Sequence, residues 1–478
     1  MKLRRHLLLA GLAGLGLRLF FVRRFATSAG DTAIYEELAR NWLDHHVYGL
    51  FVGGQLTPVD LRVPGYPAFL AAIYALFGRT QLAVMLTQAA LDLFTCFLTA
   101  ALAGFLAPKA QRRRVAVAAL WLAATCPFVA NYAAVLLTEV LATFLTALAL
   151  LTLLHAAAGE EIDPDSVERS AMVYPNWFLG GAIVGLGALV RPETPLILVA
   201  VALVLVVRWR RPVDWPKLLR AGALMAAGLA LPLVPWATRN WRTLHQVEFL
   251  APRYSQIPRE VVPRGFYAWT QTWLVRFRDV YLVPWKLEDE PISIEDLPAC
   301  AFDSAEEKQR VAALLESYNA TLLISPEWDR EFAALAAART ARHPLRTYLW
   351  IPLGRVATLW FTPRIELLPY SGQLLPLAQK WQEDPVDVCV TLGFGLLNFL
   401  YVGLALAGAR IALLRQEGKD SRLQLGLALL AAFILLRTVF LTQIETPEPR
   451  YVLVCFPAVL ALAALAWTKP QATSGAQA

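Results

Sequence analysis

The stretch "LAVMLTQAALDLFTCFLTAALAGFL" (Leu82–Leu106) carries one charged residue, Asp92, in a run long enough to cross a lipid bilayer. About 20 apolar residues in a helix span the ~30 Å hydrocarbon layer. The whole chain is 57% hydrophobic and only 17% charged, which is more apolar than a soluble core requires. We therefore predict an all-α polytopic membrane protein with about ten transmembrane helices. The predicted spans are Leu7–Val22, Leu82–Leu106, Val115–Ala130, Val140–His155, Trp177–Val190, Pro195–Val207, Ala221–Trp236, Val388–Ala409, Leu423–Leu441 and Val452–Trp467.

The basic residues indicate how these spans are oriented. With the N-terminal Lys2, Arg4 and Arg5 inside, three strongly basic loops fall on the same side: Lys109–Arg114, Arg208–Lys217 and Arg415–Arg422. Cytoplasmic loops of membrane proteins are rich in Lys and Arg, so both termini are predicted to be cytoplasmic. The net charge of +7 is thus explained by topology and does not indicate a nucleic-acid partner.

This topology places two long segments, residues 25–80 and 238–385, on the non-cytoplasmic side. Two apolar runs within them, Gly65–Gly78 and Leu345–Phe361, are too short to span and are predicted to be juxtamembrane helices. We predict an N-terminal transmembrane module (1–237) with its first external loop at 25–80, an external region (238–385), and C-terminal transmembrane helices (386–478).

The segment "SAGDTAIYEELARNWLDHH" (Ser28–His46) follows the first span. Its apolar and polar residues alternate with helical spacing, which predicts an amphipathic helix at the membrane interface. Asp31 stands at the start of this helix. From the pattern alone, Asp31 is interpreted as the N-terminal cap.

Several motifs, in order along the chain, resemble a known family. They are "GD..IY..LA..WL", an arginine followed by "PGYPAFLAAIYALFG", "LLTEVLATFLTALALL", "GLGALVRPE", "PWATRNW", "ARHPLRTYLWIPLGRV" and "PRYVLVCFPAVLALAALA". Together they resemble the GT-C membrane glycosyltransferases, in the dolichyl-phosphate-mannose and aminoarabinose transferase branch (glycosyltransferase family 39 type).

The resemblance implies a GT-C-like helix bundle and sugar transfer from a polyprenyl-phosphate donor to a lipid, glycan or protein acceptor. It implies a site on the outer face of the membrane, here the bacterial inner membrane, and inversion at the sugar. An acidic residue after the first span acts at the reaction centre in such enzymes, and Asp31 occupies that position. A carboxylate there can take the proton of the acceptor hydroxyl as a general base.

The sequence departs from the family where some relatives carry two adjacent acids, because Asp31 is followed by Thr32. Glu139, at the outer start of the fourth predicted span, is the candidate for a second catalytic acid, with helix initiation as its alternative. The cofactor stays open. Asp31 and Glu139 are the residues that would bind a divalent cation, if one is used.

A departing phosphate requires cations, and arginine suits phosphate oxygens. Arg62 matches a basic position that relatives use at the donor phosphate. Arg437 and Arg450 are candidate phosphate ligands because charged residues inside or beside spans are costly. Arg191 is a further candidate ligand of the donor phosphate, and it is predicted either to line a cavity or to pair with Glu193. Two further charges within spans, Arg18 and Asp92, are predicted to form a structural ion pair.

Two other functions are compatible with many spans. A secondary transporter would have two related halves, which the sequence does not show. A polyprenyl-lipid flippase or ligase would not use Asp31 as a base. Within residues 253–343, the aromatic residues are predicted to be interfacial anchors, with stacking on a sugar face as the alternative, in a loop that selects the acceptor; they are Phe266, Tyr267, Trp269 and Trp273.

Overall fold

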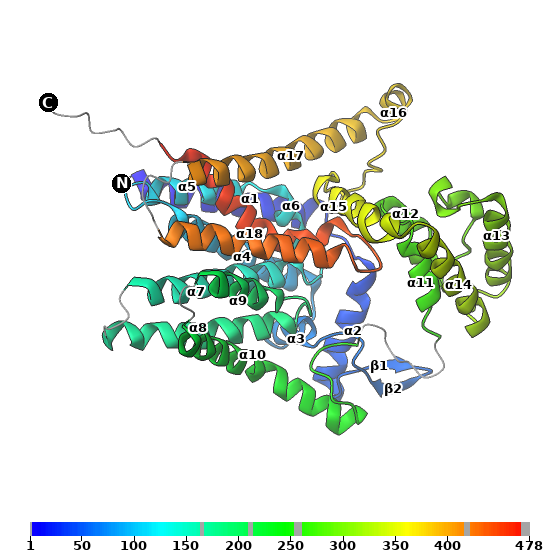
Figure 1. The fold of residues 1–478 in the computed structure, drawn as a ribbon, viewed down its shortest axis with the longest axis horizontal. Coiled ribbons are helices and arrows are strands. Elements are labelled where there is room, and N and C mark those ends of the chain that lie inside the picture. Colours follow the sequence, from blue (N-terminus) through cyan, green and yellow to red (C-terminus); the bar gives the residue numbers. More distant parts are fainter. Residues whose placement is uncertain (1, 163–166, 209–213, 253–260, 415–420, 470–478) are drawn as a thin grey trace. The chain divides into compact units, whose positions relative to one another are not determined.

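The computed structural model describes residues 2–162, 167–208, 214–252, 261–414 and 421–469, and these are mostly helical (Figure 1). The chain divides into two compact units. The first comprises Met1–Pro252, Pro363–Leu436 and Leu453–Ala478, and the second Arg253–Thr362 and Arg437–Val452.

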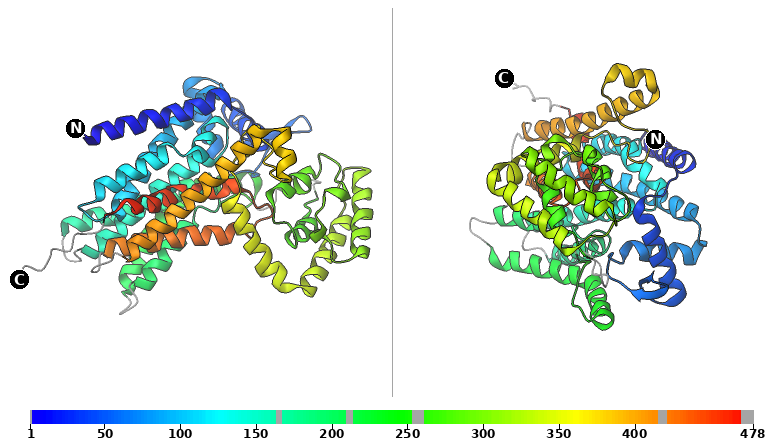
Figure 2. Two further views of the ribbon diagram at one scale, coloured as in Figure 1. Left: turned by 90° about the horizontal axis from the view of Figure 1, so that it is seen from above. Right: turned by 90° about the vertical axis from the view of Figure 1, so that its right-hand side faces the viewer.

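The first unit consists mainly of long apolar helices. They are α1 (Lys2–Arg24), α4 (Gln81–Leu106), α5 (Arg112–Ala124), α7 (Glu139–Ile162), α8 (Val167–Ala188), α9 (Leu196–Arg208), α10 (Trp215–Leu244), α17 (Pro385–Leu414), α18 (Ser421–Leu441, which continues past the unit boundary) and α19 (Phe456–Ala464). In Figures 1 and 2 the long helices α4, α7, α8 and α10 run roughly side by side.

Most of the predicted spans coincide with these helices, but Val115–Ala130 extends into the short helix α6 (Pro127–Ala130), and Val452–Trp467 begins and ends in 3-10 turns on either side of α19. Among the described residues, seven helical stretches are long and apolar enough to cross a membrane, or eight when a bent pair is included. The bent pair joins Arg112–Ala124 to Pro127–Ala134 at 48°, where Pro127 cannot donate a helical hydrogen bond. The predicted spans at 177–190 and 195–207 lie in α8 and α9. Because α9 has only 13 residues, the number of ten spans stays a prediction.

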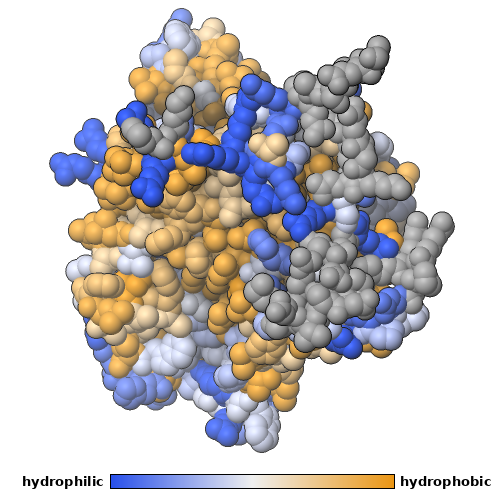
Figure 3. Space-filling view, turned by 90° about the vertical axis from the view of Figure 1, so that its left-hand side faces the viewer, coloured by the Kyte–Doolittle hydropathy of each residue, from blue (hydrophilic) through white to orange (hydrophobic). Residues whose placement is uncertain are grey.

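Large apolar side chains are exposed on these helices, for example Leu203 on α9 and Leu396 and Leu406 on α17. Hydrophobic residues also cover much of the face drawn in Figure 3. Water would disfavour so much exposed apolar surface, whereas hydrocarbon would not. The chain is therefore an integral membrane protein.

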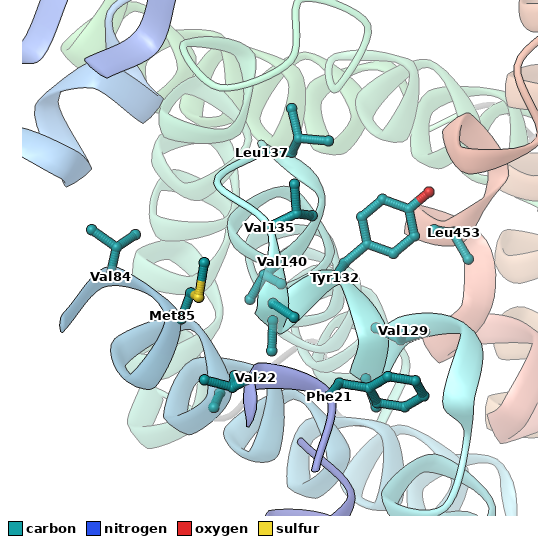
Figure 4. Packing of buried hydrophobic residues seen from close by; sticks show 14 of the residues in the cluster. Phe21, Val22, Val84, Met85, Val129, Tyr132, Val135, Leu137, Val140 and Leu453 are labelled. Carbon is teal, nitrogen blue, oxygen red and sulfur yellow. The ribbon is translucent and has the colours of Figure 1, made fainter. Parts of the chain in front are cut away.

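One buried cluster holds the first unit together around α1, α4 and the segment 127–140. Phe21 and Val22 of α1, Met85 of α4 and Val140 of α7 belong to it, together with Tyr132 (Figure 4). The predicted Arg18–Asp92 pair lies in the same region.

The Arg18–Asp92 prediction is confirmed. Arg18 Nη2 lies 2.8 Å from Asp92 Oδ2, and both side chains are almost completely buried. Arg18 also donates to the carbonyl oxygen of Ala124, at 2.8 Å. The pair therefore ties α1 to α4 and α5 while satisfying a charge that lipid could not solvate.

A small sheet interrupts the helices after α2 (Gly30–His45). Strands β1 (Gly49–Val52) and β2 (Gln55–Pro58) pair antiparallel, with Val52 opposite Gln55. The connection is Gly53–Gly54, and both residues have positive φ. Two-residue hairpin turns favour glycine for this reason, so the "VGGQ" sequence is a hairpin signal.

The second unit contains α11 (Arg264–Gln271), α12 (Phe277–Leu282), α13 (Ala305–Asn319), α14 (Pro326–Arg342) and α15 (Ile351–Phe361). Its core includes Phe266, Trp269 and Trp273, whose side chains are buried. The prediction that these aromatic residues are interfacial anchors was therefore wrong. They pack against one another and α14 because this region has its own hydrophobic core.

Glycines allow the backbones of α8 and α10 to approach each other closely. A Cβ on Gly228 would lie 2.1 Å from the carbonyl oxygen of Phe178, and one on Gly181 would lie 2.2 Å from that of Met225. Small residues let helix backbones approach closely in membranes, where van der Waals packing drives association. The two helices can therefore pack this closely only while both positions lack a side chain.

We expect Gly228→Ala to lower the free energy of unfolding by roughly 1–3 kcal/mol, because the added methyl group overpacks the α8–α10 contact. Gly222→Ala is the matched control on the same helix, since nothing lies within 4 Å of its Cβ position. Thermal unfolding of the purified protein in detergent measures both variants. Equal unfolding temperatures would contradict the close approach.

Candidate functional site

Asp31 lies in the first turn of α2 and does not cap that helix. The N-terminal cap is Ala29, and the Thr32 hydroxyl accepts a hydrogen bond from the Ala29 amide at 3.2 Å. The interpretation of Asp31 as the cap was therefore wrong. Because Thr32 satisfies the helix end, the Asp31 carboxylate is available to another element.

That element is the bend between β2 and α3 (Gly65–Phe77). Arg62 Nη2 donates to Asp31 Oδ1 at 2.9 Å. The side chains of Arg62 and Asp31 are 34% and 29% exposed, so this pair is accessible to a ligand. The Tyr48 hydroxyl donates to the Arg62 carbonyl oxygen at 2.8 Å, which positions the bend against the hairpin.

The bend also contacts the turn after α8. The Gly65 amide donates to the Leu189 carbonyl oxygen at 2.6 Å. A Cβ on Gly65 would lie 2.4 Å from that oxygen, so a residue with a side chain would separate the two segments. The glycine of the "PGYP" motif thus joins the Arg62 segment to the turn that carries Arg191.

Arg191 forms a second, buried ion pair in this turn. Its Nη2 lies 2.7 Å from Glu139 Oε1, and its Nε donates to the Thr138 hydroxyl at 3.0 Å. Arg191 also pairs with Glu193 at 3.5 Å, as the pairing alternative predicted. Glu139 is the first residue of α7 and its side chain is only 2% exposed.

Tyr35 of α2 connects the two pairs electrostatically. Burial, followed by the negative charge of Asp31, raises the pKa of Tyr35 to about 12. The charges of Arg62, Arg191 and Glu139 also act on this phenol. The four predicted site residues of the first unit therefore all influence the pKa of one buried tyrosine. The Tyr35 ring packs edge-on against Tyr66, with centroids 5.0 Å apart.

Neither tyrosine is predicted as a site residue from the sequence. Tyr35 lies among the apolar positions of the predicted amphipathic helix, and Tyr66 lies in a predicted juxtamembrane helix. Hydropathy alone does not distinguish a core tyrosine from one that faces charged groups. The available signal was their proximity in sequence to the charged site residues: Tyr35 follows Asp31 in "DTAIY", and Tyr66 follows Arg62 in "RVPGY".

The other two predicted arginines lie in the second unit. Arg437 donates to the Tyr451 carbonyl oxygen from Nε at 3.2 Å and from Nη2 at 3.0 Å. Arg450 Nε donates to Glu448 Oε2 at 2.5 Å, and the Arg450 guanidinium lies 5.3 Å from the Tyr451 ring centroid. Arg437 and Arg450 are thus neighbours through Tyr451.

The carboxylates as arranged do not form a ready-made site for a divalent cation. Asp31 and Glu139 each pair with an arginine, and the described part of the chain contains no group of three or more His, Cys, Asp or Glu side chains placed to hold a metal. A hard cation at Asp31 or Glu139 would therefore have to displace the arginine from that carboxylate, with water completing its oxygen shell.

Comparison with known proteins gives related folds. A family model described as dolichyl-phosphate-mannose-protein mannosyltransferase matches residues 61–236. The oligosaccharyltransferase AglB of Archaeoglobus fulgidus, solved with an inhibitory peptide and a dolichol-phosphate, is 13% identical with a TM-score of 0.51, and the match covers 98% of this chain and 50% of AglB. The same archaeal oligosaccharyltransferase in complex with Zn and sulfate is 15% identical with a TM-score of 0.50, over 96% of this chain and 48% of the other.

ArnT of Cupriavidus metallidurans, bound to undecaprenyl phosphate, is 15% identical with a TM-score of 0.39, over 96% of this chain and 77% of ArnT. No curated protein matches by sequence. The chain spans about half the length of the oligosaccharyltransferase chains that it matches. The structural matches confirm a fold similar to that of the archaeal oligosaccharyltransferase, and the resemblance to the dolichyl-phosphate-mannose-protein mannosyltransferase family extends over residues 61–236.

We expect Arg191→Met to lower the free energy of unfolding by about 3–5 kcal/mol, because it leaves the buried Glu139 carboxylate without its cation. The double variant Arg191→Met/Glu139→Gln should recover most of this loss. Thermal unfolding in detergent compares the two, with Arg79→Gln at the exposed Arg79–Asp44 pair as a control that changes little. If Arg191→Met were as stable as the wild type, the Glu139–Arg191 pair would not contribute to stability as proposed.

Proposed function

We propose that the protein is a glycosyltransferase that moves a sugar from a polyprenyl-phosphate donor to an acceptor, with inversion and with Asp31 as the general base. The observation that carries this proposal is the partly exposed Asp31–Arg62 pair, with Tyr35 and the buried Glu139–Arg191 pair beside it. Such an arrangement offers a base for a hydroxyl group and a cation for a phosphate at one place.

Asp31 is suited to the base by its position. Its carboxylate is fixed at the start of α2 and by a charge-assisted hydrogen bond from Arg62, and it remains partly exposed. Positioned carboxylates can contribute about 10²–10⁴-fold to a reaction rate by taking a proton in the transition state. Glu139 is too buried to be the first choice for this task.

The transfer itself balances without a further reactant. The acceptor oxygen forms a bond to the anomeric carbon while its proton passes to Asp31. The bond from that carbon to the phosphate oxygen breaks on the opposite side, and its electron pair leaves with the polyprenyl phosphate. Attack from the face opposite the leaving group inverts the anomeric configuration.

Arg62 is the proposed ligand of the donor phosphate. A guanidinium presents five N–H donors in a planar fork, so Arg62 can contact Asp31 and a phosphate oxygen together. Arg191 is a positioning residue in this proposal, because it is bound to Glu139 and Thr138 inside the protein. Arg437 and Arg450 remain proposed phosphate ligands on the second unit.

The remaining assignments rest on topology and resemblance. We place the Asp31 segment on the non-cytoplasmic face and both termini in the cytoplasm, since the basic loops alternate with the spans. Residues 238–385 would then be an external region that selects a lipid, glycan or protein acceptor. From the resemblance we also propose that the membrane is a bacterial inner membrane. A divalent cation is proposed on the same basis, but no step above requires it.

The test is transfer of labelled sugar from polyprenyl-phosphate sugars by membranes that hold the full chain. We expect Asp31→Asn to lose at least about 100-fold in rate, the low end for a lost general base. Asp44→Asn, on the exposed end of the same helix, should retain the wild-type rate. Unimpaired transfer by Asp31→Asn would rule out the general base. Movement of lipid across the membrane without any covalent product would favour the flippase alternative.

Arg62→Gln tests the phosphate ligand separately. We expect its KM for the donor to rise about tenfold, the loss of one charge-assisted contact, and Arg62→Lys to recover part of this loss because lysine keeps a point charge. Steady-state kinetics with increasing donor concentration separate KM from kcat. A fall in kcat with an unchanged KM would assign Arg62 to orienting Asp31 alone.

A further inference from the structure

A pocket at the end of α14 lies apart from the residues discussed above. It has a volume of about 560 Å³ and opens to the surface. Its lining is Arg342, His343, Pro344, Leu345, Arg346 and Trp350, from the end of α14 and the π-helical turn Arg346–Trp350 that follows. These residues include the "ARHPLRTYLW" motif, which the proposed reaction does not use.

The wall of the pocket carries an excess of positive charge. Among the described residues, Arg339, Arg342 and Arg346 form ion pairs with two carboxylates, those of Asp303 and Glu307. Arg339 is completely buried, so the excess positive charge faces the pocket through Arg342 and Arg346, which line it.

Arg346 also has an unused donor. Its Nη1 lies 2.6 Å from Asp303 Oδ1, but its buried Nε has no hydrogen-bond partner among the residues that the structure describes. Buried donors are normally paired, so a small shift of the Arg346 guanidinium toward a ligand with an acceptor oxygen would satisfy this donor.

The rim of the pocket is apolar. Leu345, Tyr348 and Trp350 are 68%, 73% and 62% exposed, and Leu349 and Leu353 extend the same surface. Tyrosine and tryptophan gather where membrane proteins meet lipid headgroups. The segment 346–361 is too short to span the bilayer, so such a surface fits an interfacial position.

We propose that this pocket binds the phosphate of an anionic phospholipid headgroup, with Arg342 and Arg346 contacting the phosphate oxygens and the apolar rim contacting the acyl chains. Arginine forks suit phosphate, and a ligand with both an anionic and an apolar part matches the charged wall and the apolar rim together. This lipid site is independent of Asp31 and of the proposed transfer reaction. Binding of the lipid at this site would hold the second unit at the surface of a membrane that contains anionic lipid.

The test measures equilibrium binding of a fluorescent short-chain phosphatidylglycerol to the full-length protein in uncharged detergent micelles. The matching phosphatidylcholine reports nonspecific lipid binding. We expect the wild type to prefer phosphatidylglycerol, and Arg342→Gln/Arg346→Gln to bind it about tenfold more weakly or worse. Arg310→Gln/Arg330→Gln is the matched control, because these exposed arginines of α13 and α14 do not line the pocket.

Trp350→Ala is a second variant that should fold normally, because the Trp350 side chain is exposed and lies outside the ion-pair cluster. It should also weaken phosphatidylglycerol binding while leaving the unfolding temperature unchanged. Undiminished binding by this variant and by the double arginine variant would overturn the proposal. Inorganic phosphate alone distinguishes the source: full displacement of the lipid by millimolar phosphate would assign the pocket to free phosphate, and weak displacement supports the headgroup.

Discussion

Charged groups inside an apolar bundle must find partners within the protein, because lipid offers none. The Arg18–Asp92 pair meets this constraint between α1, α4 and α5, and the Glu139–Arg191 pair meets it between α7 and the turn after α8. Each pair therefore fixes elements that are distant in sequence. Breaking one would leave a buried charge, so the arrangement of helices and the pairing of charges depend on each other.

The same constraint separates the two acidic residues of the site. Glu139 is almost completely buried and bound to Arg191, whereas Asp31 and Arg62 remain partly exposed. A side chain that reacts with a bound substrate must be accessible to that substrate. A charge pair that fixes the surrounding structure is better buried. Tyr35 lies in the electrostatic field of both charge pairs, and burial raises the pKa of its phenol further above the physiological range. The site thus combines an accessible pair with a supporting one.

Hydropathy predicted the helices, and charge within the spans predicted the Arg18–Asp92 pair, because both follow from the cost of placing residues in lipid. The proximity of the four first-unit site residues could not be derived in this way. It depends on close contacts such as that of Gly65 with Leu189, which leave no periodic signal. The Asp31 cap was misassigned because Thr32 satisfies the Ala29 amide, and the local pattern does not separate these options. The buried tryptophans of the second unit resembled interfacial anchors for a similar reason: composition does not reveal a separate core.

The Gly65–Leu189 contact has a mechanical consequence. It fastens the backbone of the bend that carries Arg62 to the turn that carries Arg191, with no room for a side chain between them. The loop therefore cannot swing away to admit a ligand without breaking that hydrogen bond. In the proposed reaction, a phosphate would therefore reach Asp31 by rotation of the long Arg62 side chain about its own bonds, while the backbone of the bend keeps its hydrogen bond to Leu189.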